Sequence, residues 1–377
     1  MDKGRFAARA CVASVVVVNV LFCASLSGQS SSRRASFSQF ASLAPQEMNP
    51  QEQRGGEEDI DSQPVRAFRT TVRDLFNQEN FQQLEEIAGA ARAQKERFRG
   101  GLWKLHVFYL TIQGPGSMTS TDAAWNAHLD RLQRWVAAKP NSITPRVALA
   151  QAHLRLAWKA RGHGYANTVP AEDWKGFDEH VRQGQEALEH ADSLGLKDAQ
   201  WFRDMQIVGL LQGWERSKMD DLLQKASSFE PGYFYYYDAY ANYLLPKWYG
   251  KPGESEAFAQ SIADKLGGQE GDLAYFMIVE DLNCCRPKGQ MQNISWERVK
   301  QGFAAVDQLY GSTNHQLNAL TYMAVRQGDR DFSQRLFVRI GSDWDEDVWR
   351  SKQNFTRAKA TLSLERKPQA AQPESGQ

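Results

Sequence analysis

The sequence contains few of the residues that usually mark a metal site. It has four cysteines in 377 residues, and Cys11 and Cys23 lie in the first thirty. The remaining two, Cys284 and Cys285, are adjacent, whereas a structural zinc site takes about four ligands at wider spacing. We therefore expect neither a metal nor a cofactor. The adjacent pair could form a strained disulfide, or remain as one buried and one exposed thiol at a helix end.

The sequence also lacks an excess of charge of either sign. It has 45 basic and 45 acidic residues, and no run rich in lysine or arginine follows the N-terminus. Nucleic-acid binding needs such a basic footprint, so we expect no nucleic-acid partner. Neither a nucleophile-elbow motif, a zinc-helix motif nor a dinucleotide fingerprint is present. These absences disfavour an enzyme without excluding one, because catalytic groups can converge from distant positions.

The first 28 residues have the order of a secretory signal. Lys3, Arg5 and Arg9 form a basic head, an apolar stretch covers residues 10–26, and small residues follow up to position 28. Cleavage after Ser27 fits this pattern. An uncleaved anchor is the alternative, since residues 10–26 approach the length of a membrane span and could tether the protein. We therefore predict an exported protein that is periplasmic, secreted or membrane-anchored.

Composition divides the rest of the chain into a folded part and two tails. Residues 29–64 are rich in Ser, Gln, Arg, Gly and Glu, and residues 363–377 in Pro, Gln, Ser and Ala. Such segments bury too little apolar surface to offset the entropy of ordering, so we predict a disordered linker and a disordered tail. The folded domain is predicted over residues 65–362.

Helical periodicity dominates this domain, and no stretch alternates as a strand would. Trp125, His128, Leu132 and Trp135 form one apolar helical face. Trp214 and Trp248 close similar stretches 34 residues apart, and a helix–turn–helix period of about 34 residues is typical of tetratricopeptide arrays. The sequence predicts an all-α fold of antiparallel helix pairs in a tetratricopeptide-like solenoid. The 81–98 segment is expected to form one helix, capped by Asn80 and ended by two glycines.

Several tryptophan-centred motifs occur in a specific order. They are Trp103-Lys104-Leu105, Trp125-Asn126-Ala127-His128-Leu129, Ala157-Trp158-Lys159-Ala160-Arg161-Gly162-His163-Gly164-Tyr165, Tyr243-Leu244-Leu245-Pro246-Lys247-Trp248-Tyr249-Gly250 and Gly271-Asp272. Together they resemble the bacterial family called domain of unknown function 4034, over roughly residues 65–340. The resemblance implies a helical fold and supplies no activity.

Two segments are candidates for a functional site. The first is a glycine-containing loop around Arg161 and His163, in which backbone amides and Arg161 could bind an anion. Alternatively, Arg161, His163 and Tyr165 could form the site of a hydrolase-like enzyme. The simpler interpretation is a glycine that ends the preceding helix.

The second candidate is the aromatic segment 233–250. Tyr236, Tyr240 and Tyr243 share a helical face, and Trp248 and Tyr249 follow. Such rows can bind a partner by stacking and hydrogen bonding, although core packing is the alternative. We favour a binding or scaffolding module for a protein segment or an envelope component over the enzyme. The argument is that so many buried hydroxyl groups would lack hydrogen-bond partners in a dry core.

Overall fold

The computed structural model describes residues 62–162, 169–195, 197–284 and 293–364. These residues are all-α, with no β-strand among them. The helices are α3 (Gln63–Asn77), α4 (Phe81–Gln94), α5 (Lys104–Ile112), α6 (Asp122–Ala138), α7 (Thr144–Arg161), α8 (Ala171–Ser193), α9 (Ala199–Gln212), α10 (Arg216–Phe229), α11 (Tyr235–Tyr243), α12 (Glu254–Leu266), α13 (Gly268–Cys284), α14 (Trp296–Leu309), α15 (Asn314–Gln327), α16 (Arg330–Ile340), α17 (Glu346–Trp349) and α18 (Lys352–Leu364). A short 3-10 turn, η1 (Arg99–Gly101), precedes α5.

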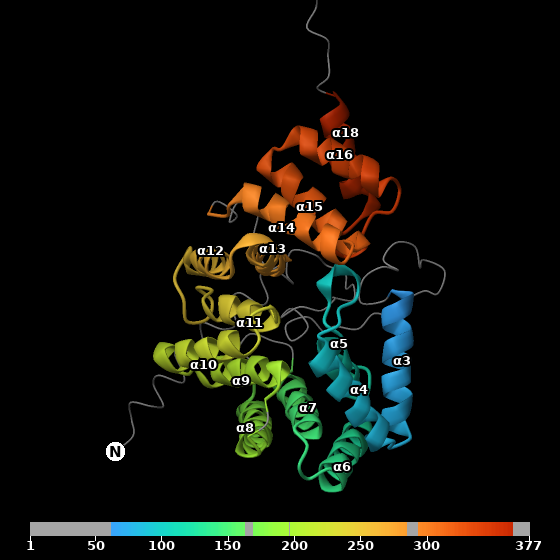
Figure 1. Ribbon diagram of the computed structural model, residues 1–377, viewed down its shortest axis with the longest axis vertical. Coiled ribbons are helices and arrows are strands. Elements are labelled where there is room, and N and C mark those ends of the chain that lie inside the picture. Colours follow the sequence, from blue (N-terminus) through green and yellow to red (C-terminus); the bar gives the residue numbers. More distant parts are fainter. Residues whose placement is uncertain (1–61, 163–168, 196, 285–292, 365–377) are drawn as a thin grey trace, which may run out of the picture.

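Consecutive helices pack as pairs, and the pairs stack. From α5 to α15, each odd-numbered helix contacts the next odd-numbered helix, and α8, α10, α12, α14 and α16 each pack against the helix before it. Figure 1 shows the chain passing from α3–α6 through α7–α12 to α14–α18 at the opposite end. Stacked pairs of this kind build a continuous core. The finer assignment to a tetratricopeptide-like solenoid stays a prediction.

Local signals explain where many helices begin and end. The side chain of Asn80 accepts from the backbone N–H of Gln83 and caps α4, as the sequence predicts. Pro145 lies in the first turn of α7, where its missing N–H costs nothing. Gly328, with φ of 73°, ends α15 before the short turn into α16. None of the helices among the described residues has the length and hydropathy needed to cross a membrane.

The expected single helix over residues 81–98 is wrong at its end. The helix stops at Gln94, because Lys95 adopts a left-handed conformation with φ of 52°. The following residues form a connector instead. Residues 95–103, which we call the closing connector, reach segments far along the chain. The amide of Gly100 donates to the carbonyl of Gly311 at 2.7 Å, and Arg99 donates to the carbonyl of Ser312 at 2.7 Å.

The closing connector leads into α5, a helix that is almost completely enclosed. Every residue from Leu105 to Ile112 is buried. The ring of His106 stacks on Tyr235 at 3.7 Å, and the backbone amide of Trp103 donates to the Tyr235 hydroxyl at 3.2 Å. The N-terminal helices are therefore held against α11 and the start of α15, although these elements lie more than a hundred residues away in sequence.

Candidate functional site

The structure places the predicted tyrosine face in the core. Tyr236 is 0% exposed, and Tyr240 and Tyr243 are each 2% exposed. The Tyr240 hydroxyl donates to Asp220, and the Tyr243 hydroxyl donates to the carbonyl of Trp214 at 3.0 Å. The argument from unsatisfied hydroxyls therefore fails for Tyr240 and Tyr243, because their acceptors lie on α10 and in the turn before it. Any binding role of these residues remains an untested prediction.

Trp248 and Tyr249 lie at the edge of the same cluster and are half-buried. The Tyr249 ring stacks on Tyr243 with centroids 5.0 Å apart, and its hydroxyl donates to the carbonyl of Leu210 at 3.1 Å. Burial raises the pKa of Tyr249 to about 12, so its hydroxyl stays protonated at neutral pH. Both residues fasten the chain after α11 onto α9.

Arg161 is the one residue of the other predicted site that the structure describes. Its guanidinium lies over the rings of Trp158 and Trp174, at 5.7 and 5.5 Å, and Nη1 donates to the carbonyl of Gly162 at 3.2 Å. Gly162 ends α7 with φ of 68°, which fits the simpler interpretation of a glycine cap. His163 and Tyr165 lie outside the described residues.

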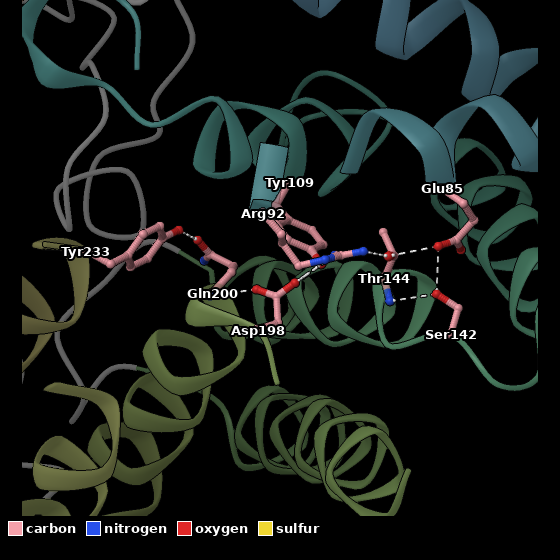
Figure 2. Close-up of polar contacts among 8 residues, drawn as sticks. All are labelled: Glu85, Arg92, Tyr109, Ser142, Thr144, Asp198, Gln200 and Tyr233. Atoms are coloured by element: carbon pink, nitrogen blue, oxygen red, sulfur yellow. Dashed lines mark hydrogen bonds and ion pairs between the residues drawn. The ribbon is translucent and has the colours of Figure 1, made fainter. Parts of the chain in front are cut away.

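A buried polar network joins four helices, α4, α5, α7 and α9, and reaches Tyr233 just before α11 (Figure 2). Asp198, just before α9, accepts from Arg92 of α4 at 2.9 Å and from the Tyr109 hydroxyl of α5 at 2.7 Å. Arg92 also donates to Thr144 at 3.0 Å, and Thr144 donates to Glu85 at 3.0 Å. Burial, reinforced by the charge of Asp198, raises the pKa of Tyr109 well above its usual value, so this hydroxyl remains a donor.

The network continues along α9 through Gln200. Its side-chain oxygen accepts from the Tyr233 hydroxyl and lies 2.9 Å from Nδ1 of His106. Its side-chain nitrogen donates to Asp204 at 2.8 Å. Burial raises the pKa of Asp204 to about 7, although neighbouring Arg203 opposes that shift. Asp204 is 0% exposed and the atoms that its Oδ1 contacts belong to the protein, so its titration bears on stability.

These geometries describe a frame that holds helices at fixed positions. We call Arg92, Tyr109, Thr144 and Asp198 the Asp198 cluster. Both of its charged groups, Arg92 and Asp198, have partners on two or more helices, which makes their arrangement specific. Across the described ranges, no three or more His, Cys, Asp or Glu side chains are grouped so that they could hold a metal ion.

A family model matches most of this frame. It covers residues 68–210 and carries the description Domain of unknown function (DUF4034). Residues 68–210 are therefore similar to this domain family. The match confirms the resemblance over this part of the expected 65–340 span, while the motifs at residues 243–250 and 271–272 lie beyond it. No curated protein and no solved structure matches the chain.

The matched residues 68–210 include seven of the eight residues drawn in Figure 2, and Tyr233 lies outside them. The sequence analysis missed this network. Asp198 and Thr144 carry a usable local signal, because Asp198 caps α9 and Thr144 begins α7. Arg92 and Tyr109 carry none, since a single arginine and a single tyrosine in helices give no indication of a partner so far away.

The outer face of α8, also within the matched residues 68–210, differs from the buried network. Phe177, Val181 and Leu188 turn inward, and α8 packs along α7. The exposed Asp, Glu, Lys and Arg side chains of α8 are mostly acidic, and they are Glu172, Lys175, Asp178, Glu179, Arg182, Glu186, Glu189 and Asp192. Six of these eight are acidic, which gives α8 a negative outer surface.

Proposed function

We propose that the protein is a binding or scaffolding module that holds a protein segment or an envelope component. The main support is the combination of a rigid inner frame with outer helices that keep one face exposed. Stacked helix pairs present extended surfaces to partners without needing any catalytic group. The Asp198 cluster adds to this, because it fixes the relative positions of α4, α5, α7 and α9.

The exposed face of α8 is the surface that this proposal assigns to a basic protein segment. Surfaces of opposite charge raise the rate at which two proteins associate, and they disfavour partners of the wrong charge. The enzyme alternative near Arg161 gains no support from the geometry, since the Arg161 guanidinium lies over two tryptophan rings.

Affinity capture from an envelope extract, followed by binding assays with each purified candidate, tests the α8 proposal. The variant Asp178→Lys/Glu186→Lys reverses two exposed charges on α8. The control Asp221→Lys/Asp331→Lys reverses two exposed acids on α10 and α16. We expect a purified partner to lose affinity for the α8 variant alone, and to bind more weakly as salt increases. Equal binding by both variants would refute the α8 surface.

We also propose that the protein is exported and that residues 29–64 act as a tether or as a free tail. The basic head and the apolar stretch over residues 10–26 support this. Fractionation with N-terminal sequencing of the purified protein tests it. A sequence starting at Gly28 indicates cleavage, and an intact N-terminus in the membrane fraction indicates an anchor. A cytoplasmic product that retains Met1 to Gln29 would contradict the proposal.

A further inference from the structure

Two histidine side chains meet between α7 and α8. Nδ1 of His153 lies 3.3 Å from Nδ1 of His180, and the two ring planes are inclined by 29°. His153 is buried on α7, whereas His180 of α8 is half-buried, so the pair reaches solvent through His180. Helix α8 packs along α7 and brings together two residues that are 27 positions apart in the sequence.

The separation of the two nitrogens suits a shared metal ion. An ordinary hydrogen bond from a nitrogen donor is about 2.7–3.2 Å long, so a direct bond between the rings would be slightly stretched. Zn²⁺ binds histidine nitrogens at about 2.0–2.1 Å, and in tetrahedral geometry two such nitrogens lie roughly 3.3 Å apart. The observed distance between the two Nδ1 atoms is 3.3 Å. The two imidazoles therefore already have the spacing of two ligands of one ion.

Both imidazoles are in the charge state that binds metal. Burial lowers the pKa of His153 to about 4, and burial also lowers the pKa of His180. Both rings are therefore neutral at physiological pH, as metal ligands must be. In the metal-free pair one Nδ1 carries the proton of the contact, and metal binding moves that proton to Nε2 of the same ring. The negative charge of Glu179 acts on both rings and favours a cation beside them.

Gln183 offers a third ligand atom on α8. Its side-chain oxygen lies 3.2 Å from Nδ1 of His180. Its side-chain nitrogen donates to Glu179 at 2.9 Å, and Arg182 donates to both oxygens of that carboxylate. These contacts fix which end of the amide faces the histidine, as outer contacts orient the ligands of metal sites. The described part of the chain brings no third His, Cys, Asp or Glu to the pair, so water completes the coordination.

We propose that His153, His180 and Gln183 bind a divalent transition-metal ion of the zinc type, which fastens α8 to α7. Imidazole nitrogens suit zinc, copper and nickel ions, whereas Mg²⁺ and Ca²⁺ prefer oxygen ligands. The scarcity of cysteine does not bear on this site, because its ligands are two imidazoles and an amide. The site uses neither Asp178 nor Glu186, so its failure would leave the proposed α8 surface intact.

Calorimetric titration of Zn²⁺ into the untagged full-length protein at neutral pH is the first test. We expect saturable binding that weakens at least about 10-fold in His180→Asn, because even changes outside the ligands cost about 10–100-fold in metal affinity. His153→Asn should weaken binding to a similar extent. The matched control is His190→Asn, at an exposed position of the same helix, and it should bind as the wild type does. An excess of Mg²⁺ should not displace Zn²⁺.

Melting temperatures with and without Zn²⁺ separate loss of the site from loss of the fold. Zn²⁺ should raise the melting temperature of the wild type and of His190→Asn, because it binds the pair only when both helices are docked. It should leave that of His180→Asn unchanged. Without metal, His180→Asn should melt within about 4 °C of the wild type, since it loses one weak hydrogen bond. Absence of Zn²⁺ binding to the wild type, or equal binding by His180→Asn and His190→Asn, overturns the proposal.

NMR of the histidine side chains tests the site in the unaltered wild type. Long-range ¹H–¹⁵N spectra distinguish the two nitrogens of each ring. Zn²⁺ should change the Nδ1 signals of two histidines, and the spectra of His153→Asn and His180→Asn should each lack one of these signals. Coordination through Nε2 of either ring, or changes confined to other histidines, would contradict the site.

Discussion

Helices α8 and α9 are neighbours in sequence, but the polar residues of α8 are mostly exposed whereas those of α9 are buried. In α8 the buried residues form one face, and its polar side chains contact each other, as Arg182 contacts Glu179 and Glu186. In α9 every residue from Ala199 to Leu210 is buried. Its polar side chains bond to distant helices, as Asp204 bonds to Gln151. An exposed polar side chain remains hydrated, whereas a buried one needs a hydrogen-bond partner within the protein.

This difference changes what a mutation should do. Exposed ion pairs contribute little, because water and salt screen them and long side chains lose entropy on pairing. Removing one member of a buried pair leaves an unmatched charge and is strongly destabilising. The comparison therefore predicts large effects at inner polar positions and small effects at outer ones.

Asp198→Ala should have the largest effect. It leaves Arg92 without its carboxylate, removes the acceptor of the Tyr109 hydroxyl and deletes the cap of α9. We expect the free energy of unfolding to fall by about 5 kcal/mol, measured by urea unfolding with circular dichroism.

The matched outer control is Asp192→Ala, whose carboxylate pairs with Lys197 at 3.2 Å with both side chains about half exposed. We expect a change within about 0.5 kcal/mol. Similar losses of unfolding free energy in Asp198→Ala and Asp192→Ala would show that buried and exposed polar residues contribute equally to stability.

Asp204→Asn should change how stability depends on pH. The pKa of Asp204 in the folded protein is raised to about 7 from an ordinary value of 3.8. Its proton therefore favours folding: the contribution is full below pH 3.8 and is lost as pH rises through about 7. We expect the wild type to lose about 4 kcal/mol relative to Asp204→Asn over this range.

The histidines titrate in both the wild type and Asp204→Asn, so their contribution to the free energy of unfolding cancels when the two proteins are compared. Urea unfolding at a series of pH values provides the measurement. Asp178→Asn on the exposed face of α8 is the control, and its curve should run parallel to that of the wild type. If the free energies of unfolding of the wild type and Asp204→Asn differ by the same amount at every pH in this range, Asp204 is ionised throughout the range.

Gly100→Ala should weaken the contact of the closing connector with α15. Gly100 has φ of 77°, and a Cβ there would lie 2.7 Å from Cγ2 of Thr313. We expect a loss of about 2–3 kcal/mol, from the left-handed conformation and the clash together. Gly328 has φ of 73° with open space around it, so Gly328→Ala should cost only about 1 kcal/mol. Thermal unfolding compares them, and equal losses would contradict a tight connector contact.

Arg182→Ala should have the smallest effect. Arg182 contacts Glu179 and Glu186 on the same exposed face of α8, where its side chain is 51% exposed. We expect an unchanged midpoint of urea unfolding, because water replaces these contacts. A lower midpoint that recovers in Arg182→Lys would show that the outer ion pairs stabilise the fold as the inner ones do.

The sequence analysis succeeded where a signal is local. The predicted Asn80 cap depends on a backbone amide three residues away. It missed α5, whose residues are buried on all sides and show no amphipathic period. It also misjudged the tyrosines after residue 233, because the hydroxyl acceptors for Tyr240 and Tyr243 lie on another helix and in the turn before it.

By itself, the amino-acid sequence determined that the described part of the chain is helical and that Asn80 caps a helix. Apolar periodicity, caps and turn residues act over one or two turns, so they can be recognised without knowing the fold. Only the tertiary structure decided which polar residues are inside. The pairing of Arg92 with Asp198, and the position of Arg155 beside Met118, join residues 106 and 37 positions apart. No local sequence pattern predicts such a contact, because burial depends on how all the helices stack together.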